Sequence, residues 1–200
     1  MGEVEVLRAP VAIMDGSGRG EADNVERREM RATTMVELAD LAMLVLNQPH
    51  LAGRQVAFVT NDQLDAHEGV DPGLARASLL GPDLTQHVEQ RSKSLSPGTQ
   101  MSGAVTALAP DVAPEVLLDV LTTIGERGVD AVVVALVSTS ALGRREIEQV
   151  LRDLARAIPH VVIVRVDPRP RSPSATVPVF ASDDGAITAL GEVVHAEAGV

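Results

Sequence analysis

Asp62, Asp65, His67 and Glu68 form the densest group of titratable side chains in this 200-residue sequence. They follow an apolar run at residues 55–60 that is typical of a buried strand. The loop after a parallel strand is where α/β proteins place their binding and catalytic groups. The group therefore suggests a cation site or a general base, and the alternative is a solvated acidic loop.

Ser138, Thr139 and Ser140 follow the longest apolar run of the sequence, residues 131–137. Their hydroxyl groups stand where a central parallel strand would end, a position that suits anion binding. The plainer interpretation is that one of them caps the helix expected from residue 143. Serine and threonine side chains accept hydrogen bonds from the free backbone N–H groups at a helix N-terminus.

Three arginines, Arg165, Arg169 and Arg171, flank a proline-rich loop at residues 167–176. Guanidinium groups at this place suit a nucleotide phosphate or the carboxylates of a partner. We favour a loop that keeps this part of the protein solvated, because connecting segments usually run over the surface.

Gly16, Gly18 and Gly20 are spaced as in a phosphate-binding turn, but the apolar helix that such a fingerprint requires does not follow them. Residues 15–28 are therefore interpreted as a flexible connector. The five histidines lack the His-x-x-x-His spacing of a helical metal site, and cysteine is absent from the sequence, so we expect no metal site. The sequence has no Gly-x-Ser-x-Gly motif, and no catalytic residue is assigned.

The elements that position these groups alternate between apolar strands and amphipathic helices, which predicts an α/β fold with a doubly wound parallel sheet. A mobile amino-terminal segment, residues 1–30, is expected to precede the folded domain, residues 31–200. Strands are expected at about 10–14, 55–60, 131–137, 160–166 and 177–180, and helices at 34–47, 114–127, 143–157 and 182–198.

Acidic residues outnumber basic ones by 28 to 17, which gives the chain a net charge of −11. An acidic chain without a basic block is poorly suited to nucleic acid or an anionic membrane, so neither is expected as a partner. The seven apolar residues at 131–137 fall far short of the roughly 20 that span a bilayer. The amino terminus lacks the pattern of a secretion signal, so a cytoplasmic location is expected.

Three segments, residues 31–61, 128–142 and 177–194, together resemble one known module. It is the flavodoxin-like CoA-ligase domain of NDP-forming acyl-CoA synthetases, in the superfamily of succinyl-CoA synthetase. Similar modules are fused to GNAT-type protein acetyltransferases. The resemblance implies a flavodoxin-like fold and a CoA or adenine nucleotide ligand. It places ligand contacts at the strand ends, on Thr60, Asn61, Asp62, Ser138 and Thr139.

The chain departs from that family where the family handles phosphate. A glycine-rich turn follows the family's Thr-Asn, whereas Asp62–Asp65 contains two carboxylates and no glycine. The family's Asn-Pro-Val-Asp stretch corresponds to Gly103–Thr106, and its phosphohistidine segment has no counterpart between residues 20 and 34. We therefore interpret the chain as a degenerate, non-catalytic domain that acts by association or by weak binding of a CoA- or nucleotide-type ligand. The alternatives are a subunit of a split synthetase, or a regulatory acyl-CoA-sensing module that partners a GNAT acetyltransferase.

The helix at 34–47 has more apolar surface than one face requires. One stripe of the helix consists of Met35, Leu38, Leu41, Ala42 and Val45. Met43, Leu44 and Leu46 are expected to add apolar surface beyond it. A helix that is apolar on more than one side needs a second surface to cover it. This pattern predicts a homo-oligomer or a partner subunit.

Overall fold

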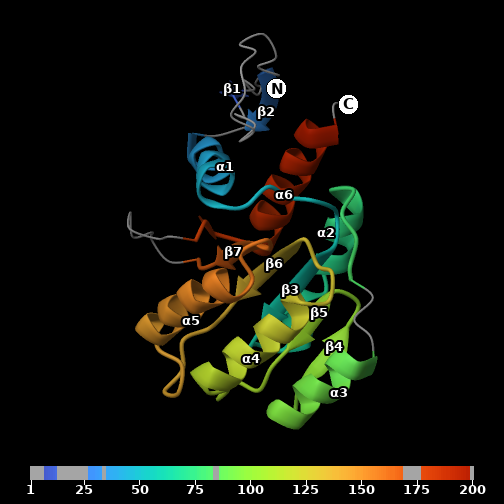
Figure 1. Ribbon diagram of the computed structural model, residues 1–200, viewed down its shortest axis with the longest axis vertical. Coiled ribbons are helices and arrows are strands. Elements are labelled where there is room, and N and C mark those ends of the chain that lie inside the picture. Colours follow the sequence, from blue (N-terminus) through green and yellow to red (C-terminus); the bar gives the residue numbers. More distant parts are fainter. Residues whose placement is uncertain (1–6, 13–26, 33–34, 83–85, 169–176, 199–200) are drawn as a thin grey trace.

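A six-stranded sheet forms the centre of the protein, as the computed structural model shows (Figure 1). The structure describes residues 7–12, 27–32, 35–82, 86–168 and 177–198. In spatial order the strands are β4 (Gln100–Ser102), β5 (Val105–Ala107), β3 (Val56–Thr60), β6 (Ala131–Ala135), β7 (Val162–Val166) and β8 (Val179–Phe180).

All neighbouring strands of this sheet are parallel except β4, which runs antiparallel to β5 at the edge. Numbered along the chain, the five parallel strands lie in the order 2-1-3-4-5, which is the flavodoxin-like arrangement. The predicted doubly wound fold is therefore confirmed. The strand order reverses between β3 and β6, so the carboxyl ends of these two strands meet at the place where such sheets bind ligands.

Helices cover both faces of the sheet. One apolar cluster joins the sheet to α1 (Met35–Asn47), α2 (Val70–Arg76) and α6 (Asp183–Ala198). The other joins it to α4 (Pro114–Gly125) and α5 (Arg144–Ala157), and α3 (Gln86–Leu95) contacts α4. Successive side chains of a strand point to opposite faces, so a strand covered on both sides must be apolar throughout. In β6, Val133 belongs to the first cluster, whereas Val132 and Val134 belong to the second.

The segment at 61–73, whose Asp, Gly and Pro residues are typical of a loop, is partly helical. It holds a short 3-10 helix, η1 (Leu64–His67), and the start of α2 at Val70. Pro72 lies in the first turn of α2, where a backbone N–H has no partner within the helix and proline is tolerated. The stretch at 96–113, which is rich in Gly, Pro, Ser and Thr, contains the β4–β5 hairpin, which turns at Gly103.

The amino-terminal part contains a two-stranded antiparallel sheet, β1 (Leu7–Ala12) with β2 (Arg27–Ala32). It lies beside α1 at one end of the molecule, and β2 contacts both α1 and α6 (Figure 1). The sequence suggested one short strand here, at 10–14, and missed β2. The glycine-rich connector falls largely outside the described residues, and the mobility expected of residues 1–30 stays a prediction.

Helix α1 has the predicted extent, but one of its side chains lies elsewhere than expected. Leu44 is 3% exposed and belongs to the apolar core with Leu41, three residues earlier on the same helix face. The expectation that Leu44 adds outer apolar surface was wrong. Leu46 is 78% exposed, as expected, and Met43 is half-buried.

None of the helices in the described ranges is long and apolar enough to cross a membrane.

Candidate functional site

The carboxyl ends of β3 and β6 bring together the residues that the sequence singled out. Thr60 is the last residue of β3, and Asn61 and Asp62 follow it. Ser138 and Thr139 lie just beyond β6. Because β3 and β6 are neighbours in register, with Thr60 opposite Ala135, the two loops leave the sheet side by side.

Asn61 ties these two loops together. Its Oδ1 accepts a hydrogen bond from the backbone N–H of Val137 at 2.7 Å, and its Nδ2 donates to the carbonyl of Val137 at 2.9 Å. The same Nδ2 lies 3.4 Å from the carbonyl of Pro110, in the loop after β5. The side chain is buried, and both ends of its amide are engaged by backbone. Asn61 therefore closes the crevice at the strand reversal instead of presenting a free amide to a ligand.

Thr60 and Asp62 have different surroundings. The hydroxyl of Thr60 is fully buried and accepts a hydrogen bond from the N–H of Asp62 at 3.0 Å. Asp62 is exposed, and its Oδ1 accepts a hydrogen bond from the N–H of Gln63 at 2.7 Å. The first exposed group after β3 is thus a carboxylate, which repels an incoming phosphate.

Ser138 and Thr139 are half-buried, and neither caps α5. The helix N-cap is Gly143, which makes no side-chain cap bond, so the capping role expected for residues 138–140 was wrong. The hydroxyl of Thr139 instead accepts a hydrogen bond from the N–H of Leu142 at 3.1 Å. The N–H of Thr139 donates to the carbonyl of Leu142 at 3.0 Å, and the two bonds close a tight turn before α5.

His67 pairs with a residue that the sequence did not indicate. Its Nδ1 lies 2.7 Å from Oδ2 of Asp183, the first residue of α6, and its ring contacts the ring of Phe58 with centroids 4.9 Å apart. The side chain of His67 is only 10% exposed. In the part of the chain that the structure describes, Nε2 is buried and has no hydrogen-bond partner.

The acidic cluster expected around His67 does not converge. Asp62, Asp65 and Glu68 are all exposed, and the partner of His67 comes from α6 instead. No group of three or more metal-ligating side chains comes together within the described ranges. The arrangement therefore resembles the solvated acidic loop more than a cation site.

Arg165 was expected at the end of the strand at 160–166, beside a solvated loop; the strand is confirmed, but the side chain is not solvated. Arg165 lies on β7 with its side chain only 5% exposed, and its Nη2 donates to Oδ2 of Asp167 at 2.8 Å. Glu148 of α5 approaches Nη1 at 3.9 Å. The guanidinium is thus engaged by carboxylates of its own chain. Arg169 and Arg171 lie outside the described residues.

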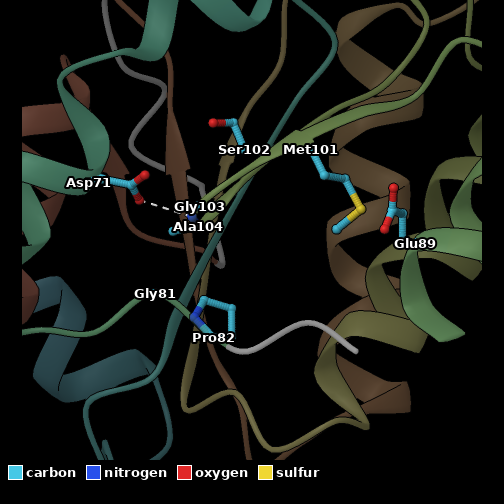
Figure 2. Close-up of a pocket in the computed structure, with 8 residues that line it drawn as sticks. All are labelled: Asp71, Gly81, Pro82, Glu89, Met101, Ser102, Gly103 and Ala104. Atoms are coloured by element: carbon cyan, nitrogen blue, oxygen red, sulfur yellow. Dashed lines mark hydrogen bonds between the residues drawn. The ribbon is translucent and has the colours of Figure 1, made fainter. Parts of the chain in front are cut away.

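An open cavity of about 350 Å³ lies at the β4 edge of the sheet (Figure 2). Figure 2 shows Asp71 and Glu89 on opposite sides of it, with Ser102 and Met101 on the hairpin between them. Asp71 accepts a hydrogen bond from the N–H of Ala104 at 2.9 Å. Among the described residues the charged side chains that line the cavity are the carboxylates of Asp71 and Glu89, which disfavour a phosphate-bearing ligand such as CoA or ADP.

Solved structures from two organisms share the fold of this chain. The dinucleotide-forming acetyl-coenzyme A synthetase 1 of Ca. Korarchaeum cryptofilum matches with a TM-score of 0.66 in its apo form and 0.65 in complex with phosphate and ADP. PH0766 from Pyrococcus horikoshii OT3 matches with a TM-score of 0.71. Each is 13% identical to this chain and covers 84% of it. No known family model and no curated protein sequence matches the chain.

The similarity confirms the expected resemblance at the level of the fold. This chain spans only 38% of the length of the Korarchaeum protein and 41% of PH0766. It therefore corresponds to one part of each larger chain.

Proposed function

We propose that this chain is a non-catalytic domain with the fold of one part of an NDP-forming acyl-CoA synthetase, and that it acts by associating with another chain or with a second copy of itself. The observation that carries the proposal is the position of Asn61. Its amide occupies both backbone polar groups of Val137 at the strand reversal, where a ligand of this fold class would bind.

A CoA- or nucleotide-type ligand at Thr60, Asn61, Asp62, Ser138 and Thr139 would be held weakly. Asn61 and Thr60 have their polar groups engaged by backbone, and Thr139 uses its hydroxyl in a turn. Asp62 brings a carboxylate to the same place. Donors that are already paired gain little from a new acceptor, and the negative charge opposes a phosphate.

The first test is a thermal-shift comparison with CoA, acetyl-CoA, ATP, ADP and Mg²⁺. A ligand present at 100 times its dissociation constant adds about 2.7 kcal/mol to the free energy of unfolding, so tight binding is easily detected. We expect no shift of that size with the native chain. Asp62→Gly removes the exposed carboxylate and should increase the response to ADP, whereas Asp65→Gly, a matched change at an exposed η1 position, should not.

The second test is turnover. The purified chain should not couple acyl-CoA to formation or hydrolysis of ATP, and robust turnover by the chain alone would overturn the proposal. A subunit of a split synthetase is the second candidate, because the chain spans about two fifths of each similar protein. Turnover that appears only when separate CoA-binding and ATP-grasp chains are added would favour that candidate.

A further inference from the structure

A second cavity, of about 380 Å³, lies at the opposite end of the strands from the site described above. Its walls come from the end of α1, the second half of α5 and the start of β7. The cavity lies beside the part of β7 that does not pair with β8. β8 pairs with Arg165 and Val166, and among the described residues no strand lies beside the first half of β7 on that side.

The side chain of Gln48 provides the hydrogen-bond acceptor on this side of β7. Its Oε1 accepts a hydrogen bond from the N–H of Ile163 at 2.8 Å, and this bond anchors the end of α1 to β7. The N–H of Ile163 thus has an acceptor, and the cavity beside it stays open. The apolar part of the lining consists of Pro49, Ala155, Pro159, Val161, Ile163 and Val177, and Asn47, Gln48, Arg152 and Arg156 complete it.

Arg152 gives the cavity a positive rim. Its Nη2 donates to Oε1 of Gln149 at 2.8 Å, which is a neutral acceptor. Within the described residues Arg152 forms no ion pair, whereas Arg156, one turn further, pairs with Asp153 at 2.9 Å. A guanidinium left without a carboxylate on a chain of net charge −11 favours an external anion.

We propose that this cavity binds a small organic carboxylate with a short apolar body. The carboxylate would pair with Arg152, whose planar fork matches a carboxylate in two parallel hydrogen bonds. The apolar body would cover Ala155, Val161 and Val177. The volume is at the lower end of the range for small-molecule sites, which fits a ligand of this size.

The test uses hexanoate as the probe. Two controls accompany it: 1-hexanol has the apolar chain without the carboxylate, and acetate has the carboxylate without the long apolar chain. Binding is followed by the backbone amide NMR shifts of Ile163 and Val177. We expect hexanoate to shift both amides more strongly than either control. No shift at millimolar hexanoate, or an equal response to hexanol, overturns the proposal.

Three variants locate the site. Arg152→Gln should weaken hexanoate binding about tenfold or more, because a charge-assisted bidentate contact is lost. Arg145→Gln makes the same change at an exposed position of the same helix that does not line the cavity, and should leave binding unchanged. Ala155→Phe should block the cavity. If Arg152→Gln or Ala155→Phe binds hexanoate as the native chain does, the assignment is wrong.

Discussion

His67 and Asp183 lie 116 positions apart in the chain, and the Nδ1 atom of one meets the Oδ2 atom of the other at 2.7 Å. The contact joins η1, directly after β3, to the first turn of α6. A carboxylate at the N-terminus of a helix is stabilised by the free N–H groups there, so Asp183 is well placed for this role. The pair fixes the last helix of the fold against the loop that follows the first strand of the sheet.

We expect Asp183→Ala to lower the free energy of unfolding by about 1–3 kcal/mol, because it strips a buried imidazole of its hydrogen-bond partner. Urea denaturation measures this. Asp184→Ala is the matched control, since Asp184 and its partner Arg76 are both largely exposed and such pairs contribute about 0–1 kcal/mol. Equal losses for the two variants would contradict a special role for the His67 contact.

Asn61→Ala should cost about 2–3 kcal/mol in the same experiment, because it leaves the N–H and the carbonyl of Val137 without partners. Asn61→Asp should be no better tolerated. It keeps an acceptor for the N–H but turns a second acceptor toward the carbonyl. Asp62→Ala, at the exposed neighbour, should change the free energy of unfolding by less than about 0.5 kcal/mol. A tolerated Asn61→Asp would show that the amide is not needed to close the crevice.

Gly103→Ala should be more damaging than an ordinary glycine substitution. Gly103 has φ of +54°, and a Cβ atom there would overlap the carboxylate of Asp71. We expect a loss of about 2–4 kcal/mol from backbone strain and overpacking together. Gly128→Ala isolates the backbone cost, since Gly128 has φ of +81° with open space around it, and should lose about 1–2 kcal/mol. Identical losses would mean that Asp71 moves aside freely.

If the chain self-associates through α1, light scattering should give a dimer or larger, and Leu46→Glu should shift it toward monomer without unfolding it. Leu46 is largely exposed, so a charge there costs the monomer little. Leu80→Glu is the control, because Leu80 is also an exposed leucine but lies outside α1. A clean monomer of the native chain at high micromolar concentration would exclude homo-association and leave a different partner.

Most of the fold could be predicted from the sequence because its central strands are apolar on both faces and its helices have clear stripes. The runs around Val133 and Val164 and the stripe of Ile147 and Leu154 each indicate one element. The start of α2 was missed because Pro72 and Gly73 are typical of loops, and in the structure Gly73 packs against Ile187 of α6. Local sequence carries no information about such a tertiary contact.

The site was predicted less completely, for a related reason. Parallel strands end at the same edge of a sheet, so the residues after two such strands, Asn61 and Ser138, could be predicted to share that edge. The structure places them together. The hydrogen-bond partners of Asn61 and His67 could not be predicted, because they lie 76 and 116 positions away in the chain. Leu44 was misplaced since helical spacing gives the relative positions of side chains but leaves open which face the core covers.

The edge strands of the six-stranded sheet, β4 and β8, are short, and this affects how the sheet can associate with other chains. An outermost strand presents unpaired N–H and carbonyl groups, and a long one invites another chain to extend the sheet into a filament. Here the outer strands have only three and two residues, and one of them is antiparallel to its neighbour. Neither offers a template for polymerisation of the six-stranded sheet. Extension of this sheet through its edges is therefore disfavoured, and helix and loop surfaces are the more suitable contacts for an assembly.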